Sequence, residues 1–132
     1  MTARILIVED EMLVAWEMEA ILNDGGHRCV GIAPDLASAS SFFDVPLDLA
    51  LVDLNLRDGL TGPQIGERLS RAGVPVIFIT ANPALLGEGI AGAVGVMTKP
   101  TDEDTLLAAV DFALAWRAGT SRKAPKRLRL FG

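Results

Sequence analysis

Two apolar runs in this chain end abruptly on carboxylates. In "ILIVEDE" the apolar run 5–8 is followed by Glu9 and Asp10, and in "ALVDLNL" the apolar run 50–52 is followed by Asp53. Carboxylates that share one site repel one another, so they stay ionised together only where a cation compensates their charge. Mg²⁺ is suited to this because it takes oxygen ligands and often bridges carboxylates to phosphate. Since an aspartate can act as a nucleophile and form an aspartyl phosphate, the pattern predicts phosphoryl chemistry at Asp53.

Two further side chains follow apolar runs and have the chemistry to meet a phosphoryl group. Thr80 ends "VIFIT" and offers a hydroxyl, and Lys99 follows "VGVMT" and offers a point charge on a long stem. Backbone N–H groups of the adjacent loops would add further donors. Taken singly, each residue has an ordinary interpretation: Asp53 as a helix cap or loop residue, Thr80 as a strand residue and Lys99 as a solvated charge. The hypothesis of phosphoryl transfer therefore depends on the whole set.

A parallel sheet would bring these residues together. Short apolar runs alternate with amphipathic segments five times along the chain, which predicts a sheet with helices on both faces. In such sheets the ligand site lies at the carboxyl ends of the strands, where all of these side chains fall. We expect strands at 4–8, 28–33, 49–52, 75–79 and 94–98, and helices at 11–23, 36–43 (capped by Asp35), 62–72 and 102–118 (started by Thr101). Four glycines between 82 and 95 predict a short or frayed helix there.

Composition narrows the class of protein. The chain has 132 residues, half of them apolar, which suits one domain at 1–118 followed by a basic tail at 119–132 that we expect to be flexible. It shows no apolar run long enough to span a membrane and no signal peptide, and its lone Cys29 fits an inert, buried thiol. We therefore expect a cytoplasmic protein. The net charge of −5 argues against nucleic acid as the main partner.

The ordered motifs "VEDE", "LVDLNL", "FITAN" and "TKP" resemble the receiver domain of bacterial two-component response regulators. The resemblance covers roughly residues 3–118. It implies an α/β fold, namely a flavodoxin-like, doubly wound (βα)5 three-layer sandwich whose five parallel strands lie in the order 2-1-3-4-5.

The resemblance also assigns roles to individual residues. It implies that Asp53 is the phosphoacceptor, that Glu9, Asp10, Asp53 and the backbone carbonyl of Asn55 hold Mg²⁺, that Thr80, Ala81 and Lys99 contact the phosphoryl group, and that Pro100 follows a cis peptide bond. The sequence departs from the family at one position. Three residues before the lysine the family has Tyr or Phe, and this chain has Val96. Because valine has no ring, Val96 cannot provide the family's usual coupling of the Thr80 hydroxyl to a rotating ring.

Two groups of apolar residues fall outside the predicted core. Met12, Leu13 and Trp16 lie near the start of the first helix, and Trp16 falls opposite the core stripe centred on Val14. These residues predict a partner-docking patch, and the alternative is that a loop covers Trp16. On the last helix, Phe112 and Trp116 either pack against a neighbouring helix or form an interface, for instance of a homodimer.

The sequence thus predicts a stand-alone receiver domain that is not an enzyme. It would take a phosphoryl group from the phosphohistidine of a sensor histidine kinase or a histidine phosphotransfer protein, and then signal or relay by docking to a protein. One alternative is an aspartate-nucleophile phosphohydrolase, although such enzymes carry a DxD pair and a cap insertion, and here Asn55 takes the second position. The other alternative is a pseudo-receiver that binds partners without being phosphorylated.

Overall fold

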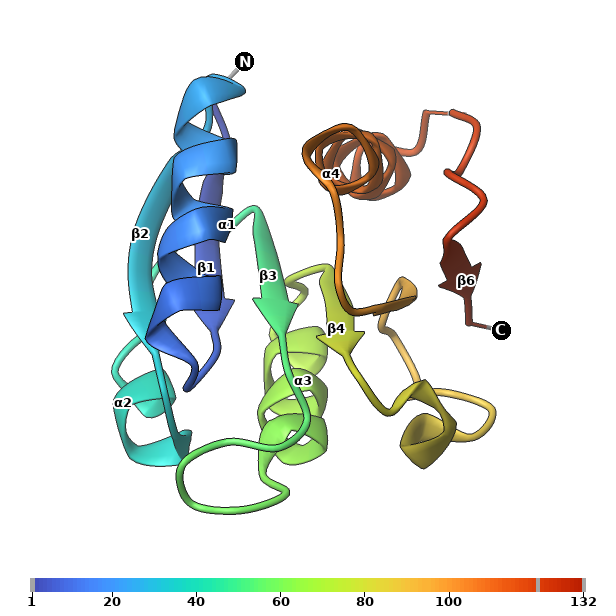
Figure 1. Ribbon diagram of the computed structural model, residues 1–132. Helices are drawn as coiled ribbons and strands as arrows, with labels where there is room; N and C mark the ends of the chain where they lie inside the picture. Colours follow the sequence, from blue (N-terminus) through green and yellow to red (C-terminus); the bar gives the residue numbers. More distant parts are fainter. Residues whose placement is uncertain (1, 121, 132) are drawn as a thin grey trace.

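Short apolar and β-branched runs form the centre of the fold. A computed structural model describes residues 2–120 and 122–131, and its strands form one sheet in the order β2-β1-β3-β4-β5-β6. Figure 1 shows β2, β1, β3 and β4 side by side in this order. The first five strands are parallel, which confirms the predicted order. Every residue of β3 and β4 is buried, as expected for strands covered on both faces. The strands are β1 (Arg4–Val8), β2 (Arg28–Ala33), β3 (Leu49–Val52), β4 (Val76–Thr80), β5 (Gly95–Thr98) and β6 (Leu128–Leu130).

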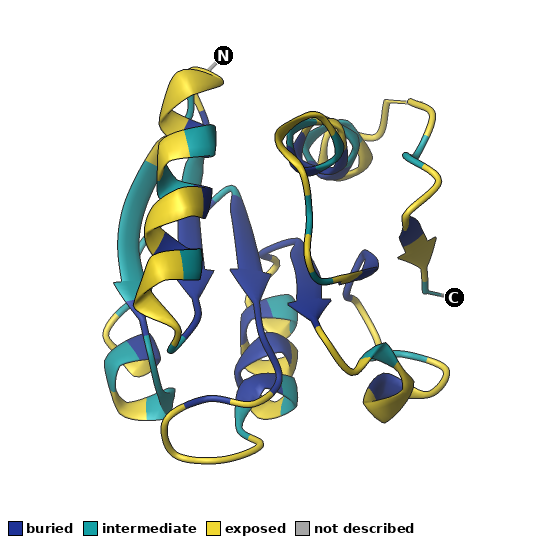
Figure 2. Ribbon diagram, viewed as in Figure 1, coloured by how far each residue is buried: buried dark blue, intermediate teal, exposed yellow. Residues whose placement is uncertain are grey.

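The helices cover the two faces of the sheet and complete the three layers. On one face α1 (Met12–Asp24) and α4 (Glu103–Arg117) pack on strand residues such as Ile7 and Ile77. On the other face lie α2 (Leu36–Ser40), α3 (Gly62–Arg71) and the short 3-10 helix η1 (Pro83–Leu86). Figure 2 shows buried ribbon turned toward the sheet and exposed ribbon turned outward. Within the described ranges, no helix has the length and apolar character to cross a membrane.

Side-chain caps fix the starts of two helices. The Asp35 carboxylate accepts a hydrogen bond from the Ser38 N–H at 2.9 Å, which confirms the predicted cap of α2. At α4 the capping residue is Asp102 and not Thr101 as predicted, because the Asp102 carboxylate accepts from the Thr105 N–H at 2.7 Å. The α2 helix ends at Ser40, earlier than expected.

The expectation of five strands is wrong, because part of the predicted tail forms a sixth. β6 pairs antiparallel with β5, with Leu128 opposite Met97 and Arg129 opposite Val96. Leu128 is buried in the core beneath α1 and α4, whereas Phe131 packs on the other face, 6.3 Å from the Phe78 ring. The pairing satisfies backbone groups of β5 that would otherwise form an open sheet edge.

The segment between β4 and β5 is mostly irregular. Residues 81–94 are all described, and their only helical turn is η1, as the glycine content predicts. Gly89 has a φ of +115°, and a Cβ built there would lie 2.5 Å from the Phe131 ring. Phe131 therefore occupies space close to this loop, and the last strand is packed against the segment that follows Thr80.

Burial also governs the chemistry of Cys29. The half-buried thiol donates to the Gly31 carbonyl at 3.3 Å, and burial raises its pKa to about 11. Because the thiolate is the reactive form, we expect iodoacetamide at about pH 8 to alkylate native Cys29 about 100-fold more slowly than the urea-unfolded chain. Intact-mass time courses in buffer and in urea measure the ratio, and equal rates would contradict the burial assigned to this thiol.

Candidate functional site

Strand register brings the carboxylates to one place. Val8 of β1 lies opposite Val52 of β3, so the next residues, Glu9 and Asp53, leave the sheet side by side. The Asp53 N–H donates to the Val8 carbonyl at 2.9 Å and holds this arrangement. One ligand oxygen each from Glu9, Asp10 and Asp53 lies within 4.8 Å of the others. The clustering expected at the carboxyl ends of the strands is therefore present.

Lys99 reaches this cluster from the end of β5. Its Nζ lies 2.5 Å from Glu9 Oε1 and 2.7 Å from Asp53 Oδ2, so one ammonium group bridges both buried acids. The Lys99 N–H also donates to the Thr80 carbonyl at 2.9 Å, and the Lys99–Pro100 peptide bond is cis. The fifth strand thus supplies the compensating charge that the sequence pattern requires.

The electrostatics of the site follow from burial. Glu9 is only 2% exposed, and this burial raises the pKa of its carboxyl, although Lys99 and the Glu11 N–H act in the opposite direction. Burial by itself lowers the pKa of Lys99, but its hydrogen bonds to Asp53 and Glu9 outweigh this, so the pKa is raised. Lys99 therefore remains charged, and Glu9 takes up a proton more readily than an exposed glutamate.

A cavity opens beside the cluster. The Thr80 hydroxyl oxygen accepts from the Asn82 N–H at 3.1 Å, which leaves the hydroxyl proton free to donate toward a ligand. Asp53 Oδ1 accepts from the Leu54 N–H at 2.7 Å. The cavity measures about 270 Å³ and is lined by Asp10, Glu11, Asp53, Asn55, Thr80, Ala81, Asn82 and Lys99.

The donor set fits a hard divalent cation. Three carboxylates converge, and among the described residues Lys99 alone bridges two of them, while Asp10 and Asn55 line the same cavity. Oxygen ligands with room for water are the surroundings that Mg²⁺ requires. Glu9, Asp10, Asp53 and the Asn55 carbonyl are thus the groups that would hold it.

A close backbone approach positions Asp53. Gly62 begins α3, and its N–H donates to the Leu54 carbonyl at 3.0 Å. A Cβ built on Gly62 would lie 1.9 Å from the Asp53 carbonyl oxygen and 2.5 Å from Leu54 Cα. Only glycine allows α3 to start this close to the acidic loop. Sequence reasoning missed this role, since the close approach is a tertiary contact.

Val96, the predicted docking patch on α1 and the two aromatic residues of α4 lie outside the acidic cavity. Val96 is buried in the core beside Phe78 and does not line the cavity. Leu13 and Trp16 are 79% and 54% exposed on α1, so no described loop covers Trp16. On α4, Phe112 packs against the core, whereas Trp116 is exposed. A homodimer through these two residues stays a prediction.

The sequence reasoning also missed an apolar groove next to the acidic cavity. It lies between α1 and the segment after β5, with a volume of about 370 Å³. Its walls include Val14, Met18 and Ile21 from α1, and Lys99 and Pro100 from the end of β5. Periodicity predicts Val14 and Ile21 in the core stripe. Both are only partly buried, because they form part of the wall of this groove.

Comparison with known proteins identifies the family to which the chain belongs. Residues 5–111 match the response regulator receiver domain, so the chain belongs to this family. Receiver domains are signalling modules of two-component systems and have no dedicated catalytic activity.

The chain is similar to several characterised response regulators. The chain is 34% identical to the phyllosphere-induced regulator PhyR of Methylorubrum extorquens, over 93% of this chain and 48% of that protein. It is 29% identical to protein PilH of Pseudomonas aeruginosa, over 86% of this chain and 98% of PilH. The crystal structure of PhyR from Brucella abortus aligns with a TM-score of 0.79 and 31% identity, covering 90% of this chain and 50% of that one. The chain thus spans about half the length of these PhyR relatives.

Proposed function

We propose that the chain is a phosphoacceptor that receives a phosphoryl group on Asp53 from a phosphohistidine donor. The observation that carries this proposal is the bridged carboxylate cluster, in which Lys99 contacts both Glu9 and Asp53, and Lys99 and Asp53 line a cavity. Membership of the receiver family supports the same assignment. The donor is a sensor histidine kinase or a histidine phosphotransfer protein, and the output is docking to a further protein.

The proposed transfer exchanges one bond to phosphorus for another. A carboxylate oxygen of Asp53 attacks phosphorus, and the O–P bond forms as the N–P bond to the donor histidine breaks. The donor ring carries a proton on its other nitrogen, so the electron pair of the broken bond leaves with a neutral imidazole, and the phosphoryl oxygens keep their negative charge. No oxidant or further reactant is needed.

Side chains of this chain would stabilise the negative charge of the incoming phosphoryl group. Lys99 already lies 2.7 Å from Asp53 Oδ2, so its ammonium remains within reach of oxygens attached there. Thr80 and Ala81 line the same cavity, and the Thr80 hydroxyl, whose oxygen accepts from the Asn82 N–H, can donate its proton to a phosphoryl oxygen. When bound at the carboxylates, Mg²⁺ supplies a Lewis acid that offsets the charge of the phosphoryl oxygens.

We expect the isolated protein to bind Mg²⁺ and to lose affinity as the pH falls. The raised pKa of Glu9 means that this carboxyl takes up a proton at a higher pH than an ordinary glutamate, and each bound proton competes with the cation. Calorimetric titrations at about pH 7.5 and about pH 5.5 measure this, and Asp10→Asn should weaken binding about tenfold at the higher pH. An unchanged affinity in Asp10→Asn would remove Asp10 from the ligand set.

One assay separates the receiver from its alternatives. The chain is incubated with acetyl phosphate and Mg²⁺, and intact mass and released phosphate are followed together. A single phosphoryl adduct that lasts for minutes supports the proposal. Continuous release of phosphate without an adduct identifies a phosphohydrolase, and neither signal identifies a pseudo-receiver.

The donor is proposed to dock on the exposed patch formed by Met12, Leu13 and Trp16. These residues are 36%, 79% and 54% exposed on the helix that begins directly after Glu9 and Asp10. A donor histidine must approach Asp53, so the helix that carries it must lie near the start of α1. An aromatic residue in such a patch often dominates binding.

We therefore expect Trp16→Ala to slow phosphotransfer from the cognate kinase about tenfold or more. Uptake from acetyl phosphate should stay unchanged, because no group at Asp53 is altered. Trp116→Ala is the matched control, since Trp116 is 48% exposed on a different helix. Rapid-quench phosphotransfer measurements test the pair. Slowing in Trp116→Ala alone would move the docking surface to α4, and equal slowing with both donors would identify Trp16 as a folding residue.

A further inference from the structure

The end of β2 and the turn that follows it contact both loops that carry the acidic site. The Ala33 carbonyl accepts from the Glu9 N–H at 3.0 Å, and the Pro34 carbonyl accepts from the Arg57 N–H, also at 3.0 Å. Glu9 belongs to the loop after β1, and Arg57 belongs to the loop after β3 that holds Asp53 and Asn55. The end of β2 and the turn after it therefore support both acidic loops.

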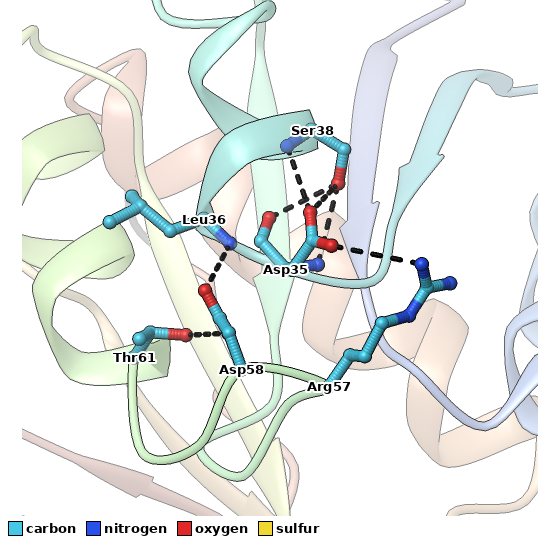
Figure 3. Close-up of polar contacts among 6 residues, drawn as sticks. All are labelled: Asp35, Leu36, Ser38, Arg57, Asp58 and Thr61. Atoms are coloured by element: carbon cyan, nitrogen blue, oxygen red, sulfur yellow. Dashed lines mark hydrogen bonds and ion pairs between the residues drawn. The ribbon is translucent and has the colours of Figure 1, made fainter.

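Asp58 adds a side-chain link between this turn and the start of α3. Its Oδ2 accepts from the Leu36 N–H at 3.1 Å, and its Oδ1 accepts from the Thr61 hydroxyl at 2.6 Å (Figure 3). Leu36 begins α2, and Thr61 directly precedes α3. The carboxylate thus ties the far end of the β3–α3 loop to a neighbouring helix, although Asp58 itself does not line the acidic cavity.

Besides the backbone bond from the Arg57 N–H to the Pro34 carbonyl, Asp58 supplies the side-chain attachment of the loop to α2. The loop is closed internally by backbone bonds between Leu56 and Gly59, which hold its shape but do not attach it to α2. The ion pair of Arg57 with Asp35 spans 3.8 Å and its arginine side chain is 68% exposed, so it contributes little. Hydrogen bonds from Thr61 and Leu36 lower the pKa of Asp58, which keeps it an acceptor at neutral pH.

We propose that Asp58 is a positioning residue for the acidic site, because it fastens the β3–α3 loop and so holds Asn55 ready for Mg²⁺. This inference rests on the proposed function. A loop that is already fixed loses little conformational freedom when a cation binds, whereas a loosened loop must be ordered at that moment and the affinity falls. Removal of the Asp58 carboxylate should therefore weaken Mg²⁺ binding without changing any ligand.

The test compares Mg²⁺ affinity by calorimetry in three variants of the whole chain. We expect Asp58→Ala to bind Mg²⁺ about fivefold or more weakly, and Asp58→Asn to stay within about twofold of wild type, because an amide of the same shape keeps an acceptor for the Leu36 N–H. Asp35→Ala is the matched control: it removes a neighbouring carboxylate that caps α2 but leaves the backbone and Asp58 bonds of the loop in place. It should also stay within about twofold of wild type.

The outcomes separate a failure of the role proposed for Asp58 from a failure of the proposed phosphoacceptor function. Saturable Mg²⁺ binding by wild type with an unchanged affinity in Asp58→Ala overturns the role of Asp58 and leaves the proposed function standing. Equal losses in Asp58→Ala and Asp35→Ala would show a general effect of charge or stability, and would also overturn it. No Mg²⁺ binding by wild type overturns both. If Asp58→Ala does not fold, Thr61→Val removes one arm of the link, and an unchanged affinity in that variant counts against the proposal.

Discussion

Asp53→Asn is expected to abolish phosphoryl uptake from both acetyl phosphate and a phosphohistidine donor. The asparagine amide has nearly the shape of the carboxylate, and its oxygen can still accept from the Leu54 N–H that now bonds Asp53 Oδ1 at 2.7 Å. It is a poor nucleophile, however, so the bond to phosphorus does not form. Intact mass after incubation with acetyl phosphate and Mg²⁺ should show no adduct, while circular dichroism should show the fold retained.

A second aspartate, which flanks the same strand at its other end, provides the control. Asp48 lies just before β3, at the opposite end from Asp53, where its carboxylate accepts from the Arg4 N–H at 2.8 Å. Asp48→Asn should therefore take up the phosphoryl group as wild type does. A full-strength adduct in Asp53→Asn, located by fragmentation at any residue, would show that Asp53 is not the phosphoacceptor.

Gly62→Ala should destabilise the fold strongly, because the start of α3 has no room for a side chain. The new methyl group would meet the Asp53 carbonyl oxygen at 1.9 Å and Leu54 Cα at 2.5 Å, and both are backbone atoms that cannot rotate away. Either α3 or the acidic loop must shift, and we expect the free energy of unfolding to fall by about 3 kcal/mol. Urea denaturation monitored by circular dichroism measures this change.

The same substitution should also slow phosphoryl uptake, because the displaced loop carries the nucleophile. Gln64→Ala is the matched control, since Gln64 is an exposed residue of the same helix and its truncation should change stability by less than about 0.5 kcal/mol. If Gly62→Ala unfolds at the same urea concentration as Gln64→Ala, the start of α3 has room for a methyl group beside the Asp53 carbonyl, which contradicts the close approach.

The sequence predicted the parallel core and the placement of the acids well, for a clear physical reason. Apolar runs such as Leu49–Val52 are long enough to identify a buried strand, and in a parallel sheet the residues that follow such strands share one edge. The positions of Glu9 and Asp53 therefore follow from strand order and register, which local patterns already determine.

The features that the sequence did not predict depend on contacts between distant segments. β6 has three residues, and the alternation of charged and apolar residues over 127–130 is too short to distinguish a strand from a basic linker. Its formation depends on the open edge of β5 and on the space near Gly89 that Phe131 occupies. The tie between Asp58 and Leu36 likewise joins residues that are 22 positions apart, and nothing local in "LRDGLTG" indicates it.

The sixth strand has a consequence for biosynthesis. A ribosome makes the chain from its N-terminus, so β5 and the whole of α4 are complete before Leu128–Leu130 leave the exit tunnel. Until then, the outer edge of β5 carries unpaired backbone groups beside Val96 and Met97, and such an edge is a template for pairing with another chain. The nascent protein therefore carries an aggregation-prone edge between the emergence of β5 and the emergence of β6, and pairing of β6 with β5 ends that interval.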